Sequence, residues 1–117
     1  MELYGCEVDA STCRQRNLGM ENNAIKDDQI HSPSSNNLAK YARLNLDLRS
    51  PIVKSCWTTS DPSPWLQVDL KSSYYITAVL TQGCGFDYTR EWVKKYKISY
   101  GNYPSEMVDY KVNGTVK

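Results

Sequence analysis

The sequence predicts an all-β protein, folded as an antiparallel β-sandwich or barrel. Several segments after residue 65 have the residue pattern of strands, and the stretches between them carry Gly, Pro, Ser and Asn rather than a helical period. At 117 residues the chain forms one domain at most, and it is long enough to bury a core of its own.

The strand pattern begins with WLQVDL (65–70), in which apolar and polar residues alternate. YYITAVLTQG (74–83) is a longer run that is rich in β-branched and aromatic residues. KYKISYG (95–101) and VDYKVNG (108–114) alternate again. We therefore expect four strands over these ranges, joined by turns.

The first half of the chain has little regular pattern. Residues 14–37 carry many Asn, Asp, Ser and Gln, which predicts loops and short turns. LGMENNAIKDDQI (18–30) is too irregular for an amphipathic helix. HSPSSNN (31–37) is a turn cluster, because Pro fixes its φ angle and Asn and Ser bond to their own backbone.

Composition excludes several classes of function. The formal charge of +1 is too small for the broad basic surface of a nucleic-acid-binding protein. The one histidine, His31, lies in a Pro/Ser loop with no nucleophile suggested by local spacing, and no Gly-rich phosphate loop is present. We therefore expect a protein that is not an enzyme and does not bind nucleic acid.

The four cysteines predict disulfides. Cys6, Cys13, Cys56 and Cys84 include no C-x-x-C pair, and a single histidine cannot complete a zinc site of the usual spacing. Disulfides imply an exported protein, yet the first residues lack the basic and apolar regions of a signal peptide. We expect a piece of a longer extracellular protein; the alternative is a complete cytosolic protein with free thiols.

Five blocks of the sequence, taken in order, resemble the discoidin family, the coagulation factor 5/8 type C domains. These blocks are LGMENNAIKDDQI, YARLN (41–45), WLQVDL, ITAVLTQG and EWVKKYKISYG. The resemblance implies a jelly-roll-like β-barrel of eight strands, with loops called spikes at one end. It also implies a domain that starts at one cysteine and closes at another.

The resemblance further implies how the chain is divided. MELYGC (1–6) is similar to the last strand of a preceding domain, residues 7–12 to a linker, and residues 13–117 to a partial discoidin domain. The closing strands and their cysteine are not in the chain, so we expect an incomplete barrel with exposed strand edges. Met107 also departs from the family, which often has Trp there.

By resemblance, Cys56 and Cys84 pair with each other, as equivalent positions do in some family members; two buried free thiols are the alternative. For Cys6 and Cys13 two arrangements stay open. Each pairs with a cysteine outside this chain, or they pair with each other while MELYGC takes the place of the lost closing strand.

The ligand-binding residues expected by resemblance lie on three spikes, at residues 34–40, 49–54 and 85–90. Membrane-binding members insert apolar spike tips into phospholipid while basic residues meet anionic headgroups. Each spike here combines apolar and basic side chains, and the predicted binding residues are Asn37, Leu38, Lys40, Ile52, Val53, Lys54, Phe86, Tyr88 and Arg90. The alternative for each tip is packing against neighbouring loops.

Other notable residues have less specific interpretations. Asp27 and Asp28 lack the spacing of a calcium loop, so we expect a solvated turn and no cofactor, with Ca²⁺ bound partly by backbone carbonyls as the alternative. Arg43 and the tryptophans Trp57, Trp65 and Trp92 are interpreted as scaffold. Asn113 begins an N-x-T glycosylation sequon, a weak signal.

These observations predict an extracellular, non-catalytic adhesion module whose partner is an anionic membrane surface or a cell-surface glycan. Two alternatives remain. One is a receptor ectodomain that binds protein or collagen of the extracellular matrix, and the other is a carbohydrate-targeting accessory domain of a larger enzyme. Frameworks of this kind carry different ligands on variable loops, so the sequence does not choose among them.

Overall fold

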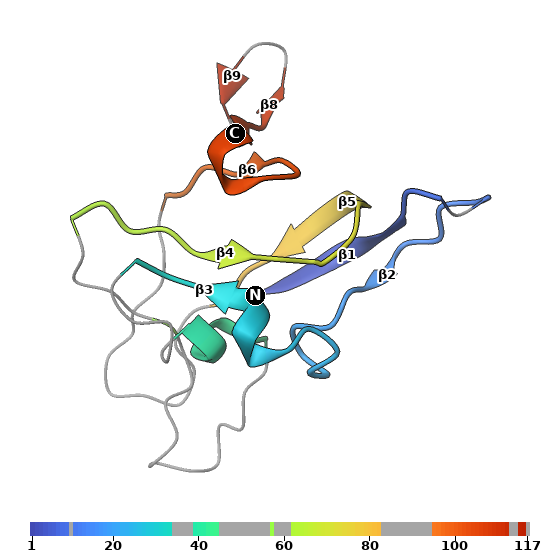
Figure 1. Cartoon of the computed structure of the whole chain (residues 1–117), viewed down its shortest axis with the longest axis horizontal. Helices are drawn as coiled ribbons and strands as arrows, with labels where there is room; N and C mark the ends of the chain where they lie inside the picture. The colour runs from blue at the N-terminus through green and yellow to red at the C-terminus, as the bar shows by residue number, and fades with distance from the viewer. Residues whose placement is uncertain are drawn as a thin grey trace.

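The computed structural model describes residues 1–9, 11–33, 39–44, 57, 62–82, 95–112 and 115–116 (Figure 1). Every strand pairing among them is antiparallel, which confirms the all-β class. Three short 3₁₀ turns accompany the strands: η1 (Asp27–Gln29), η2 (Lys40–Ala42) and η3 (Pro104–Glu106). Within these residues, no helix has the length and apolar character that crossing a membrane requires.

The main sheet has three strands in the order β2–β1–β5. They are β1 (Glu2–Glu7), β2 (Arg16–Asn17) and β5 (Tyr74–Leu80). The described residues also form three pairs of two-residue strands: β3 (Ile30–His31) with β4 (Gln67–Val68), β6 (Ser99–Tyr100) with β7 (Val108–Asp109), and β8 (Lys111–Val112) with β9 (Thr115–Val116).

The predicted strands are present, but most are shorter than expected. The run from residue 74 forms β5, the longest strand described, whereas WLQVDL contributes only Gln67–Val68. KYKISYG contributes Ser99–Tyr100, and VDYKVNG divides into β7 and β8. The ranges 65–70 and 95–101 were therefore too long as strand predictions, because each strand pairs with a partner of only two residues, and the described part of 108–114 is interrupted at Tyr110.

Much of the hydrophobic core comes from residues 14–37, the part of the chain that sequence pattern predicts as loops. Met20, Ile25 and Ile30 of this part form the buried cluster together with Ala39 and Ala42. Trp57 packs against this cluster as a scaffold residue, whereas Trp65 exposes 47% of its surface and lies outside it. Trp92 lies outside the described residues.

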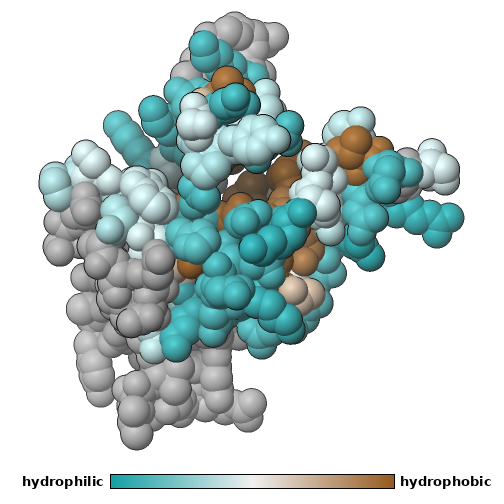
Figure 2. All heavy atoms as spheres, viewed as in Figure 1, coloured by the Kyte–Doolittle hydropathy of each residue, from teal (hydrophilic) through white to brown (hydrophobic). Residues whose placement is uncertain are grey.

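β5 lies at one edge of the main sheet. Its side chains are largely exposed, among them Tyr75, Ile76 and Leu80. Figure 2 shows hydrophobic atoms gathered around a recess in the middle of the face shown, below the C-terminal hairpins. An exposed apolar edge strand is a site where a further strand can pair.

Candidate functional site: the end of the sheet that carries the predicted spikes

Two described residues beside the predicted spikes, Leu44 and Leu80, lie at the same end of the main sheet. The N–H of Leu44, between the first and second spikes, donates a hydrogen bond of 3.0 Å to the carbonyl of Met1. The amino group of Met1 in turn donates to the carbonyl of Ala42. Leu80, which precedes the third spike, pairs with Glu2 in the sheet. The tip of β5 and turn η2 thus both lie near the start of β1 (Figure 1).

Of the nine predicted tip residues, Lys40 is the one within the described residues. It begins η2, and its Nζ lies 5.5 Å from the centre of the Tyr41 ring, a cation–π distance. A cationic side chain therefore lies at the base of the first predicted spike. The remaining predicted site residues fall outside the described residues: Asn37, Leu38, Ile52, Val53, Lys54, Cys56, Cys84, Phe86, Tyr88, Arg90 and Asn113.

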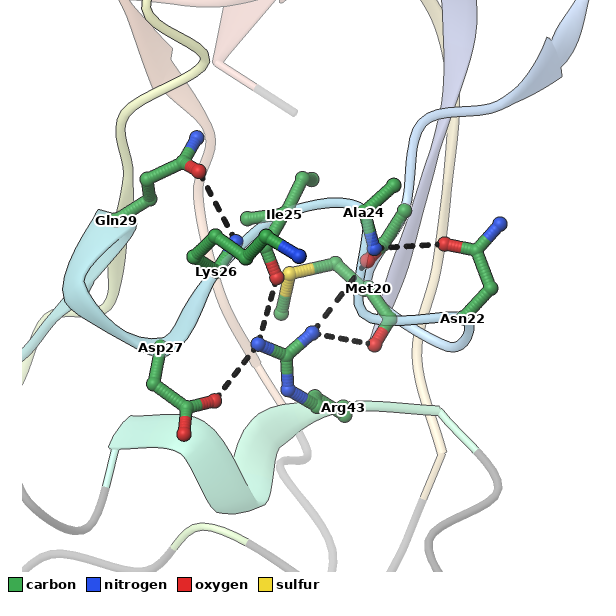
Figure 3. A network of polar contacts seen from close by, with 9 residues as sticks. Met20, Asn22, Ala24, Ile25, Lys26, Asp27, Gln29 and Arg43 are labelled. Carbon is green, nitrogen blue, oxygen red and sulfur yellow. Dashed lines mark hydrogen bonds and ion pairs between the residues drawn. The ribbon is translucent and has the colours of Figure 1, made fainter.

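Turn η2 is fixed to the core through Arg43, whose surface is only 5% exposed. Its Nη1 donates to the carbonyls of Gly19 (3.4 Å) and Met20 (2.8 Å). Its Nη2 donates to the carbonyl of Ile25 at 2.6 Å and to Oδ1 of Asp27 at 2.8 Å. Figure 3 shows the guanidinium lying between the 20–25 loop and Asp27. One buried cation therefore joins the base of the first spike to the loop that carries much of the core.

The conformation of the 19–25 loop, which surrounds Arg43, is set by contacts within the loop. Gly19 has φ +126°, a conformation that side chains disfavour, and a Cβ there would lie 2.5 Å from the Cβ of Ala24. The N–H of Ile25 donates to the carbonyl of Gly19 at 3.0 Å, which closes the loop. Oδ1 of Asn22 accepts from the N–H of Ala24 at 2.9 Å. The loop thus presents its carbonyls inward, where Arg43 binds them.

The structure changes the interpretation of Asp27. We expected a solvated turn, but the carboxylate is the ion-pair partner of buried Arg43, although its own side chain is 61% exposed. The scaffold interpretation of Arg43 agrees with this network. Among the described residues, no group of three or more His, Cys, Asp or Glu side chains could hold a metal ion.

Glu2 is a second buried polar residue at this end of the sheet, and sequence reasoning missed it. Its Oε1 accepts hydrogen bonds from the N–H groups of Leu3 (2.9 Å), Gly19 (3.2 Å) and Met20 (3.0 Å). Its Oε2 accepts from the N–H of Glu21 at 2.9 Å. Burial on its own would raise the pKa of Glu2, but the four amide donors outweigh it and bring the pKa below its ordinary value. The carboxylate is therefore ionised and fully bonded.

The structure joins Cys6 and Cys13 in a disulfide, with their Cα atoms 5.3 Å apart. This is the arrangement in which the two cysteines pair with each other. Cys6 is buried in β1, and Cys13 precedes β2, so the bond closes the short connection between the two strands. β1 itself runs between β2 and β5 as the central strand of the sheet.

The sequence of the chain is similar to a known domain family and to several known proteins, as the following matches show. Residues 8–117 match the F5/8 type C domain. The whole chain aligns with coagulation factor VIII of Mus musculus at 34% identity over 125 residues. EGF-like repeat and discoidin I-like domain-containing protein 3 of Homo sapiens is 35% identical over 84% of the chain, and lactadherin of Bos taurus is 33% identical over 71%.

The chain spans a small part of these relatives: 5% of factor VIII, 22% of the discoidin I-like protein and 21% of lactadherin. The factor VIII alignment also includes residues 1–7, which precede the domain match. No solved structure matches the chain.

Proposed function

Because the chain belongs to the F5/8 type C domain family, we propose that it is a non-catalytic binding module of an extracellular protein, which engages an anionic membrane surface through its spikes. The single observation that carries this proposal is that Leu44, between the first and second predicted spikes, and Leu80, before the third, both bond or pair at the start of β1. Loops that start from one end can contact one surface together.

The side chains of the predicted spikes support a membrane over the other partners. Each spike combines apolar and basic residues, as in Leu38 with Lys40 and Phe86 with Arg90. Burying one large apolar side chain contributes about 1.5–3 kcal/mol. A Lys or Arg near an anionic surface adds about 1 kcal/mol.

Two tips and two cations would sum to roughly 5–8 kcal/mol before ordering costs, which corresponds to millimolar to micromolar binding. A single module would therefore bind weakly, and a protein with several such modules would bind through avidity. In keeping with this, we propose that residues 1–6 derive from the last strand of a preceding domain of the same type. The transcript sequence on either side of the chain tests that division.

The test of membrane binding is co-sedimentation of the full natural protein with vesicles. Vesicles that contain phosphatidylserine should retain the protein, whereas vesicles of phosphatidylcholine alone should retain less. Leu38→Ala and Phe86→Ala should each weaken binding roughly tenfold, since each removes at least about 1.5 kcal/mol of apolar burial. Tyr103→Ala is the matched control, because Tyr103 is an exposed aromatic residue outside the predicted spikes.

Unchanged retention of both spike variants would contradict the membrane assignment. In that case a glycan array would test the second ligand class, a cell-surface glycan. Binding to immobilised collagen would test the receptor alternative.

A further inference from the structure

β1 occupies a slot whose walls come from distant parts of the chain. We define the strand slot as the facing edges of β2 and β5 together with residues 18–21. On one side, β1 pairs with β5 along its whole length, from Glu2 opposite Leu80 to Glu7 opposite Tyr74. On the other side it pairs with β2, and the N–H of Leu18 donates to the carbonyl of Leu3 at 2.8 Å. Without β1, both edges of the slot lose their partners.

The slot recognises particular residues of the strand. Three amides of its wall, those of Gly19, Met20 and Glu21, donate to the carboxylate of Glu2 at 2.9–3.2 Å. At Gly5 the two backbones approach so closely that a Cβ would lie 1.9 Å from the carbonyl oxygen of Tyr75. A strand that fills the slot therefore needs a carboxylate at its start and a glycine three residues later, a requirement that β1 meets.

The connection between β1 and β2 could let the strand leave its own slot. Its described residues within 8–15 are exposed. Fully extended, eight residues span about 26–29 Å, which is comparable to the shortest dimension of the molecule, 24 Å. The connection is thus long enough to pass β1 from one copy of the chain to another that lies beside it.

We propose that the strand slot is a peptide-binding site that accepts residues 2–7 of a second copy of this chain, and that the Cys6–Cys13 disulfide prevents this exchange until it is reduced. In the partner chain, the exchanged strand makes the same contacts that it makes within its own chain. Strand exchange is therefore a low-cost route to a dimer. While the disulfide is intact, Cys6 must stay beside Cys13 of its own chain.

Reduction by a dithiol transfers two electrons and two protons to the Cys6–Cys13 bond. The products are two thiols and the cyclic disulfide of the reductant. β1 is then attached to its slot by non-covalent contacts alone, and a second copy can compete for it in a concentration-dependent way.

Light scattering on the size-exclusion peak of the full chain tests the redox dependence. The oxidised chain should elute as a monomer of 13.4 kDa. With dithiothreitol, a species of twice that mass should grow as the concentration rises. The double variant Cys6→Ser, Cys13→Ser should form the dimer without reductant. A monomer in all three samples would overturn the proposal.

Mixing two single variants tests whether β1 of one chain occupies the strand slot of another chain. The Cys13→Ser variant keeps Cys6 of this pair and donates its β1 strand. The Cys6→Ser variant keeps Cys13 and accepts that strand in its slot. Cys6 is buried in its slot, so it should meet Cys13 of the other copy only when the donor strand fills the acceptor slot. Oxidised glutathione accepts the two electrons and two protons, which leaves a Cys6–Cys13 bond between chains that peptide mapping identifies.

The matched control for this mixture adds Glu2→Gln either to the donor variant or to the acceptor variant and compares the two yields of the cross-link. Placed on the donor, it should lower the yield of the cross-link roughly tenfold, because the slot amides then lose a charged partner. Placed on the acceptor, it should leave the yield unchanged or raise it, since it weakens the acceptor's own strand. Equal yields for the two placements, or no Cys6–Cys13 bond between chains, would overturn the proposal.

Discussion

The part of the chain before residue 83 and the hairpins after residue 94 are stabilised in different ways. In the first part, two buried charged side chains, Glu2 and Arg43, bond to backbone groups that are distant in sequence. In the hairpins the described contacts are local, such as the N–H of Tyr110 donating to the carbonyl of Ile98 at 2.7 Å. Figure 1 shows the hairpins standing apart from the main sheet. Long-range buried contacts thus determine the fold of the first part, whereas local pairing determines that of the second.

Burial makes the same distinction, since every buried side chain among the described residues lies before residue 83. Tyr96, Tyr100 and Tyr103 in the C-terminal region are all more than half exposed. The ion pair between Lys97 and Asp109, at 3.6 Å, lies at the surface. Removing a side chain from the hairpins should therefore cost far less than removing one from the network around the core.

The largest effect is expected at Arg43. Arg43→Ala would leave the carbonyls of Met20 and Ile25 without this donor and would remove the partner of Asp27. The carbonyl of Gly19 would keep only the N–H of Ile25. Breaking a buried charged network of this kind costs about 3–5 kcal/mol. Urea unfolding should show this loss as a lower midpoint with little change in slope. A loss below about 1 kcal/mol would show that the network does not stabilise the first part of the chain.

The disulfide is expected to come next. Its cysteines are seven positions apart in the sequence, and closing so short a loop contributes about 2–3 kcal/mol by the chain-entropy model. Cys13→Ser should lower the free energy of unfolding by that amount, measured in urea at low protein concentration so that chains do not associate. An unchanged midpoint would mean that β1 is fixed by its hydrogen bonds alone.

Glu2 should confer a smaller effect that depends on pH. Because its pKa in the folded chain lies below the ordinary value of 4.5, the carboxylate stabilises the fold above that pH. This contribution is lost as the pH falls through the folded-state pKa. Glu2→Gln should therefore cost about 1–2 kcal/mol at pH 7.

The difference between wild type and Glu2→Gln should narrow steadily below pH 4.5. Urea unfolding of both proteins between pH 7 and pH 3 measures it, and the other carboxylates cancel because both proteins share them. A constant difference across this range would contradict the assigned role of the carboxylate.

The smallest effect is expected in the hairpins. Tyr103 exposes 62% of its surface, so Tyr103→Ser should change the free energy of unfolding by no more than about 0.5 kcal/mol. Urea unfolding of Tyr103→Ser and Arg43→Ala under the same conditions compares the two losses of unfolding free energy. A loss comparable to that of the arginine variant would remove the distinction between the two regions.

Local pattern predicts some of this fold well. The β-branched and aromatic run from Tyr74 forms the longest strand described, and the strand pairings are antiparallel, as the lack of a helical pattern in the sequence predicts. The core was harder to predict, because Met20, Ile25 and Ile30 follow neither the period of a strand nor that of a helix. They are buried because Gly19 and Arg43 shape the loop between them, which depends on contacts across 24 residues.

The candidate site depends even more on long-range contacts. The apolar and basic residues of the three spikes can be identified from the sequence by resemblance. That Leu44 and Leu80 lie at the same end of the sheet depends on the register of β1 against β5 and on the bond from Leu44 to Met1. Neither follows from periodicity, since a two-residue shift of register would preserve the same pattern. Buried Glu2 was missed because a charged residue at the start of a strand ordinarily predicts exposure.

The guanidinium of Arg43 binds main-chain oxygens of residues 19, 20 and 25 rather than their side chains. The network therefore constrains the backbone path of the loop, and the backbone itself adds a further constraint at Asn23, whose φ of +66° favours Asn or Gly. A protein engineer who alters this loop should keep Arg43 together with Gly19 and Asn23, because these three residues determine its path.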